Sequence, residues 1–275
     1  MLDVIAFGFL AGLVAFTAGV YTKTTGMSFG LVLLVGLYSL KPLLPLFLQS
    51  IALPVFIATS LAVCFILNVF SLIRFTLEAR NSQETTLLVG NGITTQIAKA
   101  PISVIAAMIT AQLLGIVTEE LITLVFLFCL SCYLLLLIWS KRLNNNYLSS
   151  SNRKKGMYLL ASIFGVWTGN EGKELIQLAE GNRLQPDNSI VVATLISFAA
   201  CCSFMLPALP EKLALLSDNL GYIYLPGVVY LSVIGLLAIW LVRHHHNVLD
   251  FLWLRWIFFA FLSAILLREA YSYLL

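Results

Sequence analysis

The chain is poor in charged residues. Asp, Glu, Lys and Arg make up 11% of its 275 residues, whereas 60% are hydrophobic and the mean hydropathy is +0.95. Soluble domains carry about 25% charged residues. The scarcity excludes a soluble domain with one core, because so much apolar surface has to face lipid. The small net charge of +3, spread over segment ends and one loop, also excludes a nucleic-acid partner.

The chain also lacks the residue patterns of common catalytic and metal sites. We identify no G-x-S-x-G nucleophile, no H-E-x-x-H motif and no convincing Asp or His pair inside its apolar segments. Cys129 and Cys132 form a C-x-x-C, but this pair and the other three cysteines lie in apolar runs without a nearby histidine. Packed thiols are the interpretation that fits this setting. The sequence therefore predicts no enzyme, no metal site and no cofactor.

Long apolar runs dominate what is present. Runs of about 17–25 residues match the thickness of a bilayer crossed by a helix. They are continuous and show no period of two, which favours helices over a barrel. We therefore predict an all-α polytopic membrane protein with about eight or nine transmembrane or re-entrant helices. The expected segments are Leu2–Tyr21, Met27–Leu53 (as two shorter helices), Pro54–Phe75, Pro101–Val117, Leu121–Trp139, Met157–Ala179, Ser189–Leu209, Gly221–Val242 and Phe251–Leu275.

One basic loop divides these segments. Residues 141–155 hold five Lys or Arg and no acid, and Asn and Ser fill the space between them. Cytoplasmic loops are enriched in Lys and Arg, so we expect residues 141–156 to be a cytoplasmic linker of a protein in the cell membrane. The linker separates an N-terminal transmembrane repeat, residues 1–140, from a C-terminal one, residues 157–275. The polar stretch 78–98 is expected to be a loop with a short amphipathic piece.

Similar features recur on both sides of the linker. An apolar helix reaches Thr17 and Gly19 before a polar interruption at residues 21–28, and another reaches a polar interruption at residues 168–174. Each interruption is followed by an Ala-Thr pair, at residues 58–59 and 193–194. We predict two related halves with interrupted helices. The spacing of Gly8, Gly12 and Gly19 also predicts close helix packing.

These features resemble the TauE/SafE family of sulfite-exporter-like permeases. The matching residues are Gly12, Gly19, Gly26, Gly30 and residues 58–61 in the first half, and Gly165, Gly169, Gly172 and residues 193–194 in the second. The resemblance is one of layout over nearly the whole chain. It implies two halves, each with a glycine-rich interruption, that carry small sulfur-containing anions. The family's run of consecutive glycines is absent here, which puts the substrate and transport itself in question.

The interruptions hold the candidate binding residues. Transporters place broken helices at the membrane midplane, where helix N-termini attract anions. The residues expected to donate hydrogen bonds or positive charge to an oxyanion are Thr17, Thr22, Lys23, Thr24, Thr25, Ser28, Thr59, Ser60, Thr168, Asn170, Lys173 and Thr194. Glu171 and Glu174 repel an anion and are expected to bind a coupling proton or sodium ion. Plain turns outside the membrane, with solvated charges, are the competing interpretation of both interruptions.

Three functions fit these observations. The first is a secondary transporter that moves a small anion, such as sulfite or an organosulfur oxyanion, by alternating access. The second is a non-transporting membrane assembly subunit, which the missing glycine run favours. The third is an intramembrane enzyme that acts on a lipid, using Lys23, Lys173 or Arg183 at its phosphate. The expected partners are the anion, membrane lipid, the coupling ion and a second copy in a homodimer.

Overall fold

The computed structural model of the protein describes residues 2–49, 52–80, 85–140, 151–180, 188–206, 219–244 and 252–274. Within these ranges the chain is helical apart from one short antiparallel β pair. The elements are α1 (Leu2–Thr25), α2 (Phe29–Ser39), the 3₁₀ turn η1 (Lys41–Leu43), α3 (Leu46–Gln49), α4 (Ala52–Arg80), α5 (Thr85–Ile116), α6 (Glu119–Ser140), α7 (Ser151–Trp167), α8 (Lys173–Glu180), α9 (Asn188–Met205), β1 (Asn219–Leu220), β2 (Ile223–Tyr224), α10 (Leu225–His244) and α11 (Leu252–Leu274).

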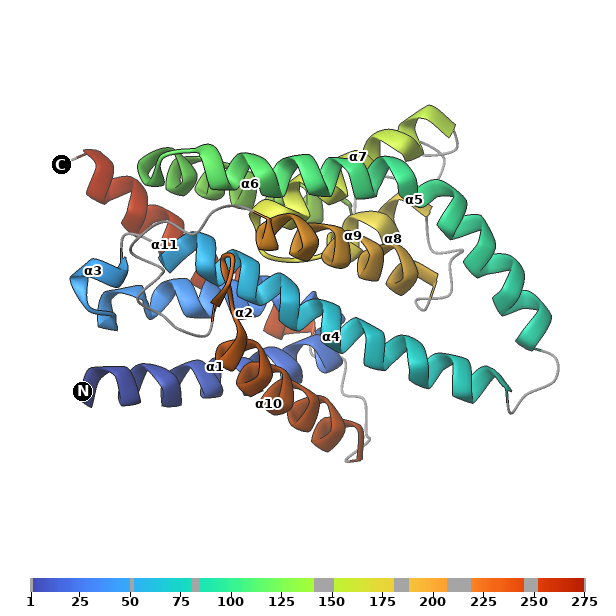
Figure 1. The fold of residues 1–275 in the computed structure, drawn as a ribbon, viewed down its shortest axis with the longest axis horizontal. Helices are drawn as coiled ribbons and strands as arrows, with labels where there is room; N and C mark the ends of the chain where they lie inside the picture. The colour runs from blue at the N-terminus through green and yellow to red at the C-terminus, as the bar shows by residue number, and fades with distance from the viewer. Residues whose placement is uncertain are drawn as a thin grey trace.

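Helices far apart in the sequence pack on one another. The first helix, α1, lies against α10 and against the short α2, whereas α7 lies against α5 and against the short α8. The two helices α4 and α9 cross in the middle, and α5 also runs along α9. In Figure 1, α5 and α7 occupy the upper part of the molecule, α1 and α10 the lower part, and α4 passes between them.

The core lies where α2, α4, α8 and α9 meet. In α2, nine of the eleven residues are buried. A helix that is buried on all sides has no polar face, which is why α2 is apolar all round. Ile57 on α4, Leu175 on α8 and Val192 on α9 are fully buried at 0% exposure. The outer helices expose large side chains instead, such as Phe9 on α1 and Trp240 on α10.

Small residues set the close approach of α1 and α10. A Cβ atom on Gly19 would lie 2.6 Å from the Cβ of Ala238, and one on Gly12 would overlap the ring of Tyr230. Close packing at these two glycines confirms the prediction from their spacing, since only small residues let helix backbones come so near. Gly8 does not take part, because a Cβ atom added at this residue would have no neighbour within 4 Å.

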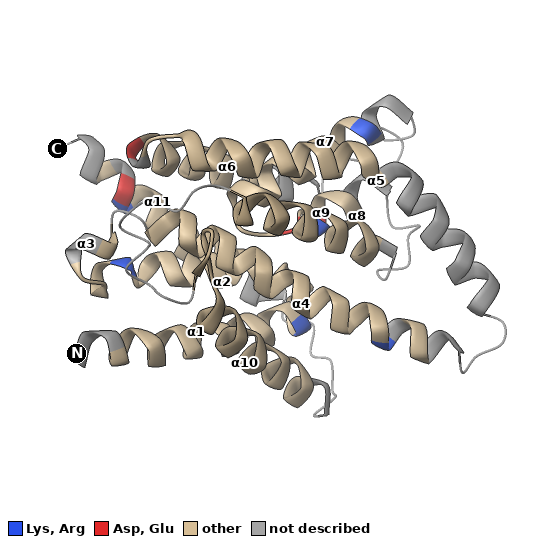
Figure 2. Cartoon of the chain, viewed as in Figure 1, with Lys and Arg blue, Asp and Glu red and all other residues tan. Residues whose placement is uncertain are grey.

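Three of the described helices are long and apolar enough to cross a membrane. These segments are Ile5–Thr25 in α1, Ala52–Arg74 in α4 and Leu225–Val242 in α10. Shorter apolar segments lie in α2, α5, α6 and α9. Figure 2 shows that the charged residues lie mainly toward helix ends, while most of the helix surface between them is uncharged.

Two element boundaries differ from the prediction. The polar stretch expected as a loop at residues 78–98 is helical from Thr85 onward, because α5 continues unbroken to Ile116 and an established helix extends at little cost. Pro101 lies inside this helix. The second difference concerns the expected linker 141–156: α7 already begins at Ser151, and residues 141–150 lie outside the described residues.

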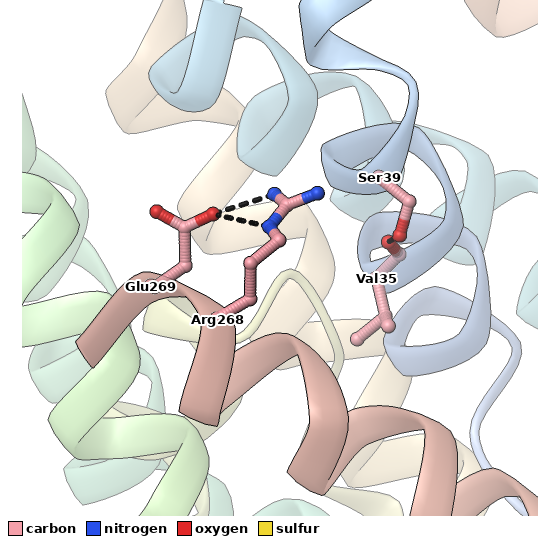
Figure 3. Close-up of polar contacts among 4 residues, drawn as sticks. All are labelled: Val35, Ser39, Arg268 and Glu269. Carbon is pink, nitrogen blue, oxygen red and sulfur yellow. Dashed lines mark hydrogen bonds and ion pairs between the residues drawn. The ribbon is translucent and has the colours of Figure 1, made fainter. Parts of the chain in front are cut away.

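An exposed ion pair marks the end of α11. A guanidinium nitrogen of Arg268 lies 2.5 Å from a carboxylate oxygen of Glu269, and the Arg268 side chain is 55% exposed. Figure 3 shows that Arg268 extends toward the last turn of α2, where the Ser39 hydroxyl donates to the Val35 carbonyl at 2.9 Å. Exposed ion pairs contribute about 0–1 kcal/mol, so this pair is a minor term in stability.

Candidate functional site

Two helix breaks of similar form lie in the two parts of the chain. Gly26 follows the end of α1 with φ 71°, and α2 starts three residues later at Phe29, after Ser28, whose backbone is extended. Between α7 and α8, Gly169 has φ 64° and Gly172 has φ 66°. These values lie in the left-handed region, which glycine adopts without the clash of a Cβ atom. Glycine therefore allows both apolar helices to stop and restart.

The two breaks touch each other inside the protein. A Cβ atom on Gly30, in the first turn of α2, would overlap the carbonyl oxygen of Gly169 and would lie 2.5 Å from the sulfur of Cys64. The hydroxyl of Ser60, on α4, lies 3.1 Å from the Gly30 carbonyl oxygen and 2.9 Å from that of Gly169. The two breaks thus form one site, with α4 beside it. They are shorter than the interruptions predicted from the sequence, because α1 continues as a helix to Thr25 and α8 already begins at Lys173.

Two carboxylates occupy this site. Glu171 is 3% exposed and accepts a hydrogen bond of 3.1 Å from the Ser28 hydroxyl. Glu174 accepts hydrogen bonds from the backbone N–H of Ser28 and from the phenol of Tyr133, on α6. Within the described part of the chain, no salt bridge reaches either carboxylate.

Helix ends supply the positive potential that these carboxylates meet. Ser28 is the N-cap of α2, so its N–H group lies at the positive end of that helix. Glu174 lies in the first turn of α8 and is therefore also at the positive end of its own helix. One carboxylate is thus shared by two helix N-termini. This arrangement can hold an anionic group without a lysine or arginine.

An Asn side chain braces the second break. Asn170 is fully buried, its amide nitrogen donates to the Thr168 hydroxyl at 2.8 Å, and its amide oxygen accepts from the Gly172 N–H at 2.5 Å. The break is therefore held in a fixed shape, which keeps Glu171 next to Ser28.

The structure brings together half of the predicted site residues. Ser28, Ser60, Thr168, Asn170, Glu171 and Glu174 meet at the two breaks through the contacts above. Thr59 lies next to Ser60 and accepts a 3.3 Å hydrogen bond from the backbone N–H of Tyr224, immediately before α10. These positions are the part of the predicted site that shares one location.

The remaining threonines are engaged within their own helices. The hydroxyls of Thr17, Thr22, Thr24, Thr25 and Thr194 donate to backbone carbonyls three or four residues earlier. Such bonds use the hydroxyl hydrogen that an anion would need. Lys23 is exposed in the last turn of α1, and Lys173 is partly exposed at the start of α8. Neither lysine has an ion-pair partner among the described residues.

Sequence reasoning did not single out Tyr133 and Cys64. A signal for each was present. Cys64 lies four residues after Ser60 and so shares its helix face. A tyrosine in an apolar helix needs a hydrogen-bond partner when it is buried, and Tyr133 is 0% exposed. What the sequence does not contain is the pairing of α6 with α8, which brings the phenol to Glu174.

The expectation that the chain contains no G-x-S-x-G pattern is wrong as to the letters, because residues 26–30 spell Gly-Met-Ser-Phe-Gly, which fits the pattern of serine hydrolases. In that pattern the serine lies on a strand-to-helix turn beside a histidine base. Here Ser28 joins two helices, and its hydroxyl donates to Glu171. No histidine contacts Ser28 among the residues that the structure describes. The pattern therefore lacks the context that makes the serine a nucleophile.

Comparisons of the chain with protein-family models, with curated proteins and with solved structures found no match.

Proposed function

We propose that this protein is a secondary membrane transporter that moves a small anion by alternating access between two related halves. The expected cargo class, sulfite or an organosulfur oxyanion, comes from the resemblance of the sequence to the TauE/SafE permeases. The observation that carries the proposal is the meeting of two broken helices in the buried centre, where Ser28 and Glu174 join them. Broken helices at a buried polar centre are how many carriers build a binding site.

The order of the helices supports two related halves. Each half has a helix, a break, a short helix, a helix with an Ala-Thr pair and two closing helices. In the first half these helices are α1, α2, α4, α5 and α6, and in the second half they are α7, α8, α9, α10 and α11. The packing is reciprocal, since the first helix of each half lies against the fourth helix of the other, and the third helices pack together. Under this proposal the long helices cross the membrane and α2 and α8 re-enter it.

The cargo site lies at the N-terminus of α2. In the structure this position is taken by the carboxylate of Glu174, which accepts the Ser28 N–H. Protonation of Glu174 removes the negative charge from that helix end. A small oxyanion then takes its place and accepts the hydrogen bonds that the helix end offers. Glu174 and the anion thus compete for one donor, which couples anion binding to proton binding.

The donors around the carboxylates favour a proton over sodium as the coupling ion. A metal cation of this kind needs several oxygen acceptors that converge on it. Glu171 and Glu174 face a serine hydroxyl, a backbone N–H and a phenol, all of which donate hydrogen bonds. The serine hydroxyl and the phenol can also rotate to accept a hydrogen bond, so a protonated carboxyl group can keep a partner for its O–H in the same site. Buried carboxylates at membrane depth are also costly, which is consistent with a working role.

Uptake into proteoliposomes tests the proposal. The purified protein is reconstituted, and the entry of sulfite, thiosulfate, a sulfonate and chloride is measured with and without an acidic exterior. We expect one sulfur oxyanion to accumulate when the exterior is acidic, and chloride to stay at the level of protein-free liposomes. Thermal unfolding in detergent gives a second measure, since a ligand at a hundredfold excess over its Kd stabilises the protein by about 2.7 kcal/mol.

The failure of every anion in both assays would reject the transporter proposal. That outcome would favour a non-transporting membrane subunit, because the breaks would then serve only the packing of the two halves. Anion entry that ignores the pH gradient would keep the transporter and reject proton coupling.

A further inference from the structure

A single hydroxyl touches the backbone of both breaks. Ser60 is 0% exposed, and its oxygen lies 2.9 Å from the carbonyl oxygen of Gly169 and 3.1 Å from that of Gly30. Gly30 belongs to the first half of the chain and Gly169 to the second. Ser60 itself is on α4, in the first half. Its bond to Gly169 therefore links the two halves directly.

One hydroxyl carries one hydrogen, so Ser60 satisfies one of the two carbonyls at a time. The two carbonyls differ in what else they meet. Gly30 lies in the first turn of α2, where its carbonyl is in position to accept the N–H four residues later. Gly169 has φ 64°, inside the break, where its carbonyl lies outside any helix. The hydrogen bond from Ser60 therefore stabilises the Gly169 carbonyl more than the Gly30 carbonyl.

The cross-half bonding is one-sided. Thr59, next to Ser60, accepts the Tyr224 N–H at 3.3 Å, so two adjacent hydroxyls of α4 reach the second half. In the corresponding helix of the second half, α9, Leu195 follows the Ala-Thr pair, so there is no hydroxyl at the position of Ser60, and the nearest two hydroxyls bond within their own helix. Thr194 donates to Ile190 at 2.6 Å and Ser197 donates to Ala193 at 2.8 Å, both within α9.

We propose that Ser60 is a positioning residue that holds the second break against the first half in this state. When the halves separate, its hydroxyl donates a hydrogen bond to the Gly30 carbonyl instead. This inference rests on the proposed transporter function. Alternating access requires the Ser60–Gly169 bond to break, because its ends belong to different halves. The Gly30 carbonyl lies close enough to receive the same hydrogen, so the buried hydroxyl keeps a partner in both states. Unpartnered buried hydroxyls are costly, and this exchange avoids that cost during transport.

The test measures the opening of the two halves without relying on transport. Cys64 is 1% exposed and lies four residues after Ser60, beside Gly30. In a background where the other four cysteines are replaced by serine, the rate at which a membrane-permeable maleimide labels Cys64 reports how often the halves part. The variants are Ser60→Ala, Ser60→Thr and, as a matched control, Ser197→Ala. Ser197 is also 0% exposed, but its hydroxyl bonds within its own helix.

We expect Ser60→Ala to raise the labelling rate by roughly two- to tenfold, since it removes one bond that holds the observed state closed. Ser60→Thr keeps the hydroxyl and should restore the rate of the Cys64-only parent. Ser197→Ala should leave the rate unchanged. In uptake assays Ser60→Ala should alter kcat more than KM, because Ser60 acts on the movement of the halves and not on the anion.

Labelling of Ser60→Ala at the parent rate would overturn the inference, and so would an equal rise in Ser197→Ala, which would mean that any lost buried hydroxyl loosens the fold. If Ser60→Thr does not fold, the contrast between the two alanine variants still decides the question. If the variants label Cys64 as expected but the parent protein transports no anion, the proposed function is rejected and the role of Ser60 in holding the two halves together stands.

Discussion

The N-cap of α2 and the first turn of α8 share one anionic group: the backbone N–H of Ser28 donates to the carboxylate of Glu174. The two residues are 146 positions apart and come from opposite sides of the basic linker. Two helix N-termini therefore point at one carboxylate, which is how this protein stabilises negative charge at its centre without lysine or arginine. Under the proposed function, an anion binds here only after this carboxylate has moved away or has been protonated.

Replacing Glu174 with glutamine tests the coupling step. Gln keeps the size of the side chain and an oxygen for the Ser28 N–H, but it does not titrate. We expect Glu174→Gln to abolish the dependence of anion uptake on an acidic exterior, while entry down the anion's own gradient persists. Glu269→Gln is the matched control. This carboxylate pairs with Arg268 near the end of α11, away from the two breaks, so the variant should respond to pH like the parent. Full pH dependence in Glu174→Gln would contradict the assignment.

Tyr133 supplies the second hydrogen bond to Glu174. The Tyr133→Phe variant removes the phenol hydroxyl and leaves the carboxylate one donor short. Hydrogen bonds to charged groups contribute about 1.5–3 kcal/mol, so we expect a loss of that size in the free energy of unfolding. Chemical unfolding in detergent measures it. Tyr271→Phe, at a side chain that is 67% exposed, should unfold like the parent. Equal effects in both variants would show that the Tyr133 bond adds nothing.

The contact between the two breaks depends on the absence of a side chain at Gly30. An added Cβ would overlap the Gly169 carbonyl and lie 2.5 Å from the Cys64 sulfur, so Gly30→Ala should push the breaks apart. Overpacking of this kind costs about 1–3 kcal/mol. Gly8→Ala is the matched control, because nothing lies within 4 Å of its added Cβ and alanine favours the helix by about 0.5–1 kcal/mol. Thermal unfolding of the two variants should shift in opposite directions.

Asn170→Asp should make stability depend on pH. The change keeps the oxygen that accepts the Gly172 N–H, removes the donor to Thr168 and adds a third carboxylate beside Glu171 and Glu174. Repulsion among the carboxylates is greatest when all are ionised, so we expect the variant to unfold at lower temperature than the parent at about pH 8 and the gap to narrow by about pH 5. A gap that stays constant with pH would point to the lost donor as the whole effect.

Several features of the candidate site were predictable from local sequence alone. Gly26, Gly169 and Gly172 mark the breaks because a helix that stops inside an apolar run needs residues that tolerate a left-handed backbone. Gly12 and Gly19 predicted a close helix contact, and that contact is found with α10. Ser28, Asn170 and Glu171 were selected as polar residues inside apolar surroundings, where a polar group requires a partner.

Other expectations depended on partners that local sequence does not specify. The threonines of α1 were expected to face an anion, but their hydroxyls donate to their own backbone, which is the nearest acceptor in any helix. Lys23 was expected at the site and is exposed at the end of α1. Tyr133 reaches the site only because α6 packs on α8.

The sequence by itself determined that this is a helical chain with helices long and apolar enough to cross a membrane, because a continuous apolar run can satisfy its backbone hydrogen bonds locally only as a helix. It also determined where the helices break, since a break needs glycine at particular positions. Only the tertiary structure decided that the two breaks meet, that Ser28 and Glu174 pair across 146 residues, and that Ser60 touches both halves. Those contacts are made by helices packing at long range, and no period or spacing along the chain encodes which helix faces which.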